Sequence, residues 1–89
     1  MAAMTQTDQA RMRAILEALS EMPDGLSADA LSPLVEIATG RAWTDEDRKL
    51  LLLTLRGKGL ISTYTNRVTD VVTYLLTDLG RVALSGMAQ

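Results

Sequence analysis

The chain has 89 residues, of which nine are basic and eleven are acidic, and its formal net charge is −2. Hydrophobic residues make up 47% of the sequence and the mean hydropathy is +0.10, which is typical of a globular protein and too apolar for a disordered one. Cysteine and histidine are both absent, which excludes disulfides, thiolate metal sites and the commonest general base.

The N-terminal part of the chain predicts one helix. Residues 1–7 have neither a basic region nor an apolar run, so we expect a short flexible end there and no secretory signal. Hydrophobic residues then recur on one helical face from Met12 to Met22. The turn-forming run Pro23-Asp24-Gly25 ends this helix.

The start of a second helix is less clear. Ser27 is a suitable N-cap, but Pro33 would then lie inside the helix, where it removes a hydrogen bond and clashes with the preceding turn. Pro33 is better suited to the first position of a helix. We therefore expect a short turn over residues 28–31 and a helix from Pro33 to about Thr39, ended by Gly40.

A third helix and a hairpin follow. Thr44 is the expected cap of the helix, which runs to about Arg56 and ends at Gly57-Lys58-Gly59. The hydrophobic period then changes from helical to alternating, which predicts strands over residues 60–65 and 71–77 with a turn over 66–70 between them. A short last helix is expected over 79–84, and a second flexible end near 85–89.

This order indicates one domain over residues 1–89, mainly α with a small β-hairpin, an α+β arrangement. Two local patterns are similar to parts of known regulators. Leu51, Leu52 and Leu55 followed by Gly59-Leu60-Ile61 resemble the end of a recognition helix and its exit into a wing. Tyr74-x-Leu76-Thr77-x-x-Gly80-Arg81 resembles the close of the wing in MarR- and PadR-like regulators. The chain thus resembles the winged helix-turn-helix superfamily.

The resemblance implies a three-helix core with a two-stranded wing and a short C-terminal helix. It also implies that the third helix enters the major groove of double-stranded DNA, that the protein regulates transcription, and that it acts as a homodimer. Residues 41–67 hold six basic and three acidic residues, a net charge of +3, whereas residues 1–40 carry −4. Such a split suits an anionic partner, although ordinary solvated charge explains it equally well. The candidate DNA-binding residues are Arg41, Arg48, Lys49, Arg56, Lys58 and Arg67.

A protein-interaction module is the alternative reading. If the three leucines of the recognition-helix pattern face the core, Leu50 and Leu53 lie outside, unless the helix is rotated or another element covers them. An exposed apolar pair on a small domain indicates a partner surface, so the chain would be an adaptor or inhibitor that does not bind DNA. The isoelectric point near 4.9 favours this reading. Trp43 either stacks on a base or fills the corner between helices two and three.

Signals of catalysis are lacking. Gly57-Lys58-Gly59 follows a helix and does not have the spacing of a phosphate-binding loop. Helix capping explains the acidic run 45–47, and no base accompanies the serines. We expect neither an enzyme nor a cofactor or metal site. The longest apolar run, Leu50–Leu53, is far too short for a membrane span, so the sequence predicts a soluble cytoplasmic protein without a membrane partner.

Overall fold

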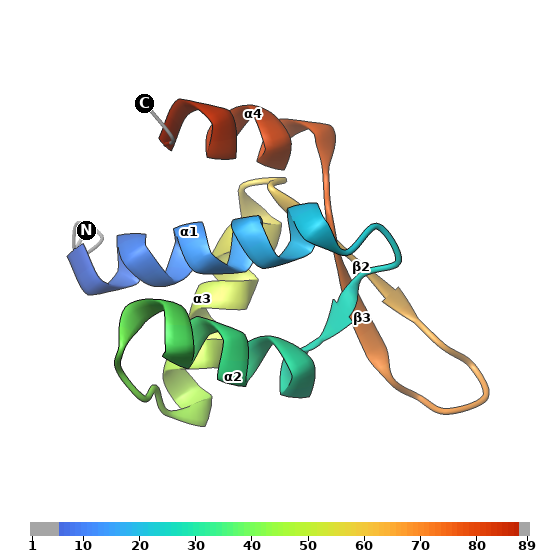
Figure 1. Cartoon of the computed structure of the whole chain (residues 1–89). Coiled ribbons are helices and arrows are strands. Elements are labelled where there is room, and N and C mark those ends of the chain that lie inside the picture. The colour runs from blue at the N-terminus through green and yellow to red at the C-terminus, as the bar shows by residue number, and fades with distance from the viewer. Residues whose placement is uncertain (1–5, 88–89) are drawn as a thin grey trace.

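The computed structural model describes residues 6–87, and Figure 1 shows how its elements are arranged. In chain order these elements are α1 (Gln6–Glu21), β1 (Leu26–Ser27), α2 (Ala28–Thr39), α3 (Asp45–Gly57), β2 (Ile61–Thr65), β3 (Val72–Leu76) and α4 (Asp78–Met87). The α1 and α2 helices lie side by side in front of α3, and the hairpin of β2 and β3 extends to one side. The predicted order of three helices, a hairpin and a last helix is confirmed, and the fold is α+β.

The hydrophobic core lies between α1, α2, α3 and the base of the hairpin. Its side chains are aliphatic, because the sequence has no phenylalanine. The buried members are Ala14, Ile15, Leu16, Leu19, Leu31, Val35, Leu51, Leu52, Leu55, Leu60 and Ile61. The three leucines of the recognition-helix pattern therefore point inward, as expected, and their helical spacing fixes which side of α3 faces away from the core.

The second helix begins earlier than predicted. α2 is continuous from Ala28, and Pro33 lies inside it, so the expected turn over 28–31 followed by a helix from Pro33 is wrong. Ser27 caps the helix, because its side chain accepts a hydrogen bond from the backbone N–H of Ala30 at 3.3 Å. The cap at Ser27 therefore starts the helix ahead of Pro33, but a cap contributes only about 0.5–2 kcal/mol, less than the roughly 3 kcal/mol that a proline costs inside a helix.

The position of Pro33 explains why the helix tolerates it. The hydrogen bond that proline cannot donate would go to the carbonyl of Asp29, which lies in the exposed first turn where water can solvate it. On either side of Pro33, Leu31 and Val35 are completely buried. Burying both side chains is worth several kcal/mol, roughly the cost of one proline in a helix.

α3 begins and ends as predicted. The Thr44 side chain accepts a hydrogen bond from the backbone N–H of Asp47 at 3.0 Å. At the other end, the N–H of Leu60 bonds to the carbonyl of Leu55 at 3.0 Å, and Gly59 adopts a left-handed conformation with φ of 76°. This C-terminal motif turns the chain directly from α3 into β2, so the hairpin is fixed relative to the helix.

The sheet has three antiparallel strands in the order β1-β3-β2. The hairpin pairs Ile61 with Leu76 at its base, and β1 pairs Leu26 with Tyr74 on the other edge of β3. The sequence did not predict β1, because two residues show no alternating pattern. Gly25, with φ of 85°, leads into β1, and a Cβ on it would lie 2.6 Å from the carbonyl oxygen of Tyr74.

The last helix is longer than predicted and is anchored to the start of β2. The Thr77 hydroxyl donates to the carbonyl of Gly59 at 2.6 Å and accepts from the N–H of Gly80 at 3.0 Å. Of the ends expected to be flexible, Gln6 and Thr7 belong to α1 and residues 85–87 to α4, while 1–5 and 88–89 lie outside the described residues. Between residues 6 and 87, none of the helices combines the length and hydropathy of a membrane crossing.

Candidate nucleic-acid interface

A groove of about 550 Å³ runs between α3 and the hairpin. Of the residues in the range 6–87, three basic side chains and no carboxylate line it. The remaining lining is hydroxyl and apolar. The lining residues are Ala28, Arg48, Lys49, Leu52, Leu53, Arg56, Thr63, Thr65, Val72 and Tyr74. A concave surface with cations on its helix wall and threonine hydroxyls on its strand wall suits the phosphate backbone of a nucleic acid.

The phase of α3 sets which side chains this groove receives. Lys49, Leu53 and Arg56 follow one another at i, i+4 and i+7, so they share one face of the helix. This face borders the core-facing side of the helix at Leu52, which also lines the groove, and it lies farther from Leu51 and Leu55. Leu50 and Leu53 are both 65% exposed, whereas Leu52 is 4% exposed. The predicted division of the leucines between core and surface is therefore confirmed, and the described elements cover neither Leu50 nor Leu53.

Arg48 contributes to the groove from a partly buried position. Its guanidinium donates to the hydroxyl of Ser32 at 2.9 Å and pairs with the Asp45 carboxylate at 2.9 Å. Arg48 thus joins α2 to the first turn of α3 and offsets one of the acidic groups there. A second acidic group of that turn, Asp47, lies 3.9 Å from the guanidinium of Arg11 on α1.

The turn of the hairpin is well defined and carries Arg67. Asn66 accepts hydrogen bonds through its side-chain oxygen from the backbone N–H groups of Val68 at 2.9 Å and Thr69 at 3.3 Å. Asp70 adopts a left-handed conformation with φ of 57°. This arrangement leaves Arg67 exposed at the tip of the hairpin, apart from the three basic residues of the groove.

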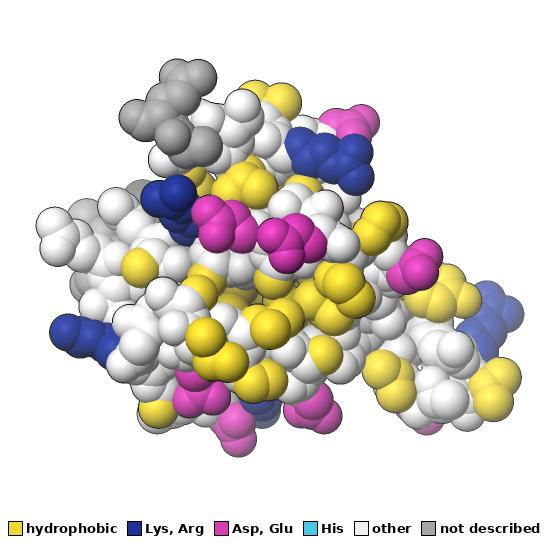
Figure 2. Space-filling view, in the orientation of Figure 1, with side chains coloured by type: hydrophobic (Ala, Val, Ile, Leu, Met, Phe, Trp, Pro, Cys, Tyr) yellow, Lys and Arg dark blue, Asp and Glu magenta, His cyan; other side chains and the backbone are white. Residues whose placement is uncertain are grey.

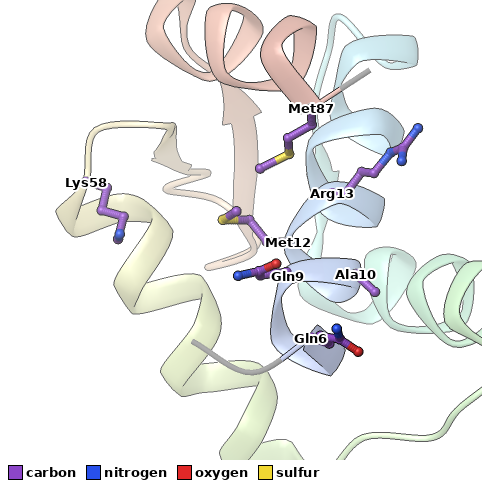
Figure 3. Close-up of a pocket in the computed structure, with 7 residues that line it drawn as sticks. All are labelled: Gln6, Gln9, Ala10, Met12, Arg13, Lys58 and Met87. Atoms are coloured by element: carbon purple, nitrogen blue, oxygen red, sulfur yellow. The ribbon is translucent and has the colours of Figure 1, made fainter. Parts of the chain in front are cut away.

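Two other candidates lie away from the groove. Lys58 lines a separate cavity of about 640 Å³ between α1, the end of α3 and α4, where Met12 and Met87 are its apolar neighbours (Figure 3). Arg41 is exposed between α2 and α3 and lies beside the start of α1. The structure therefore gathers Arg48, Lys49 and Arg56, and leaves Arg41 and Lys58 on other surfaces.

Arg11 is a residue that the sequence did not single out. It is the buried basic residue of α1, with 9% of its surface exposed, and it donates to the carbonyl of Ala42 at 3.2 Å. Its guanidinium also lies 5.8 Å from the ring centroid of Trp43, which packs against the core between α2 and α3. Arg11 therefore holds the segment that leads into α3. Its spacing of four residues before Ile15 was the available signal, because it places Arg11 on the core-facing side.

The face formed by α1 and α2 has a different character. Figure 2 shows acidic side chains over α1 and a group of hydrophobic side chains between the two helices. Among the exposed residues of this part are Glu17, Glu21, Leu34 and Ile37. Exposed carboxylates of the first part of the chain thus gather over α1 beside a few basic side chains, whereas the groove lies next to α3, behind α1 and α2 in this view.

Comparison with known proteins gives matches in structure alone. No family model matches the chain, and no curated protein sequence does. A proposed transcriptional regulator from Thermoplasma acidophilum has a TM-score of 0.76 at 21% identity, over 92% of this chain and 78% of that one. A MarR family transcription regulator has a TM-score of 0.62 at 29% identity, over 84% of this chain and 46% of that one.

A mutant of MepR from S. aureus is a third similar structure, with a TM-score of 0.69 at 22% identity. This match covers 93% of the chain and 64% of MepR, so the chain spans about half to two thirds of the length of the last two proteins. In each of the three comparisons the matched part covers at least 84% of this chain. The chain therefore has the winged helix-turn-helix fold, with α3 in the place of the recognition helix and β2 and β3 as the wing.

Proposed function

We propose that the chain is a DNA-binding regulator of transcription that contacts duplex DNA through α3 and the wing. The observation that carries this proposal is the groove between these elements, which Arg48, Lys49 and Arg56 line and no carboxylate from residues 6–87 lines, with Arg48 paired to Asp45 at its margin. The similarity of the chain's structure to those of transcription regulators, one of them in the MarR family, supports the same role. The role is non-enzymatic and belongs to the compartment that holds the DNA, here the cytoplasm.

The basic residues take different parts in this proposal. Lys49 and Arg56 are exposed on the groove face of α3 and are positioned for phosphates or guanine edges. Arg67, at the wing tip, is positioned for the backbone or the minor groove. Arg41 and Lys58 would reach phosphates only at the margins of the interface, since they lie on other surfaces. We further propose that residues 1–89 form one domain. Two copies of it would bind paired half-sites on the DNA as a homodimer.

A salt titration of binding to random-sequence duplex DNA tests the proposal. Each phosphate that a basic side chain neutralises adds about −0.9 to the slope of log affinity against log salt. We therefore expect Lys49→Ala and Arg56→Ala each to weaken binding and to reduce that slope by about one. The matched control is Arg13→Ala, because Arg13 is an exposed arginine of α1 that pairs with Glu17 instead. Affinity without salt dependence, or equal slopes for all three variants, would contradict the proposal.

A protein-interaction module remains the second candidate, because Leu50 and Leu53 are both 65% exposed on α3. In that case Leu50→Lys with Leu53→Lys should leave the domain folded and abolish association with a partner or a second copy. Melting curves and size-exclusion chromatography on this double variant provide the measurement. Leu52→Lys is the control, since it places a charge in the core and should unfold the domain. If the double variant is folded and both its association and its DNA binding are unchanged, Leu50 and Leu53 take part in neither function.

A further inference from the structure

The outer face of α3 combines two kinds of side chain that rarely attract the same ligand. Leu50 and Leu53 are both 65% exposed and lie one turn apart at i and i+3. On the same face, Lys49 precedes Leu53 by four residues and Arg56 follows it by three, and all three of these side chains line the groove. Leu50 lies beside these three side chains and does not line the groove. An occupant that covers both leucines must therefore place anionic groups near Lys49 and Arg56 and extend an apolar group beyond the groove toward Leu50.

Nearby carboxylates do not cancel this cationic character. Asp45 is paired with Arg48 at 2.9 Å, and Asp47 lies 3.9 Å from Arg11, so two of the three acidic groups in the first turn of α3 are offset by arginines. None of the three lines the groove, and the third, Glu46, is exposed on the outer face of α3, three residues before Lys49 and four before Leu50. The cationic side chains of the groove therefore favour an occupant with many negative charges, such as a nucleic acid, over a protein surface with few acidic residues.

Duplex DNA offers one apolar group in its major groove, the C5-methyl group of thymine. We propose that Leu50 and Leu53 contact thymine methyl groups, so that α3 prefers half-sites with A·T pairs under its middle turn. The inference rests on the proposed function, since it names the bases that the same surface reads. The spacing fits: residues at i and i+3 are separated by about 4.5 Å along a helix, close to the ~3.4 Å between adjacent base pairs.

The experiment compares two synthetic duplexes that differ only in this methyl group, poly(dA-dT) and poly(dA-dU). Binding of the full chain is measured by fluorescence anisotropy at one low salt concentration. Burying one methyl group is worth about four-fold in affinity. We therefore expect the chain to bind the thymine duplex at least about four-fold more tightly than the uracil duplex. The double variant Leu50→Ala, Leu53→Ala should bring this ratio close to one.

The control is Leu79→Ala, because Leu79 is an exposed leucine of α4 outside the groove and its loss should leave the ratio unchanged. Equal affinity of the unaltered chain for the two duplexes would overturn the inference while leaving the proposed function intact. A ratio that survives in the double variant would also overturn it, since the methyl group would then be read elsewhere. Failure to bind either duplex at low salt would instead contradict the proposed function.

Discussion

At the scale of single residues, Arg11 shows how one side chain can set the position of α3. It reaches from α1 to the carbonyl of Ala42 and lies over the ring of Trp43, immediately before the cap of α3. Its Nε and the Nε1 of Trp43 are buried without a hydrogen-bond partner among residues 6–87. Burying these two donors without partners costs free energy, which the other contacts of Arg11 must offset. The position of the segment before α3 therefore depends strongly on Arg11.

We expect Arg11→Met to lower the free energy of unfolding by roughly 1–3 kcal/mol, because it leaves the carbonyl of Ala42 without its partner and uncovers Trp43. Arg13→Met is the matched control on the same helix. Its ion pair with Glu17 is about half exposed, so its loss should cost no more than about 0.5 kcal/mol. Urea denaturation of both variants measures the difference, and equal losses would show that Arg11 does not hold this segment.

The burial of Arg11 illustrates a limit of sequence reasoning. Helical spacing places Arg11 on the core-facing side of α1, but only the tertiary position of Ala42 and Trp43 decides whether a guanidinium there is buried or solvated. Lys58 has the same difficulty. Nothing in the local sequence shows that the chain turns at Gly59 in such a way that Lys58 faces α1 and α4 instead of the groove.

At the scale of secondary-structure elements, the last helix depends on a close approach between backbones. Gly80 is buried, and a Cβ added to it would overlap the carbonyl group of Leu60. This contact gives a physical reason for the glycine in the pattern Tyr74-x-Leu76-Thr77-x-x-Gly80, which the sequence offered only as a resemblance. Gly86 lies in the same helix, and a Cβ added to it would meet no atom of residues 6–87 within 4 Å.

Substituting the two glycines should therefore have opposite effects. Gly80→Ala should lower the free energy of unfolding by at least about 1 kcal/mol and at most several kcal/mol, because α4 must shift away from Leu60. Gly86→Ala should stabilise the domain by about 0.5–1 kcal/mol, since alanine is the better helix former and its Cβ would meet no atom of the described residues within 4 Å. Thermal melts of both variants provide the test. A stabilising Gly80→Ala would show that α4 does not pack closely on the start of β2.

The elements themselves were largely predictable, and the exceptions have local causes. Strong capping at Thr44 and the glycines after Arg56 fixed the bounds of α3, on which the candidate interface depends. The predicted start of α2 was wrong because burying Leu31 and Val35 stabilises the longer helix enough to offset the cost of Pro33 inside it. The strand β1 was not predicted because its pairing partner, β3, lies far along the chain.

At the scale of the whole molecule, the distribution of charge matters more than its total. The chain has a net charge of −2, yet the groove is cationic and the face of α1 and α2 carries exposed carboxylates. At an ionic strength of 0.1 M, interactions are screened beyond about 10 Å. DNA at the groove would therefore respond to the charges near α3 and hardly to those on the opposite face.

Two substitutions with the same change in net charge test this distribution. Glu46→Gln removes an exposed carboxylate from the first turn of α3, and we expect it to raise affinity for duplex DNA by about two- to five-fold. Glu21→Gln, at the end of α1, should change that affinity by less than about 1.5-fold in the same buffer. Equal gains in anisotropy titrations would indicate that only the total charge counts.

The strand order β1-β3-β2 has a consequence for how the protein is made. During synthesis, β1 and β2 leave the ribosome before β3, and neither can pair with the other because β3 lies between them in the finished sheet. A nascent chain that has not reached residue 72 can form its helices, but its two outer strands have no partner. Both the wing and the pairing of β1 therefore wait for β3, so the sheet beside the proposed DNA-contacting surface can be completed only once residues 72–76 are available.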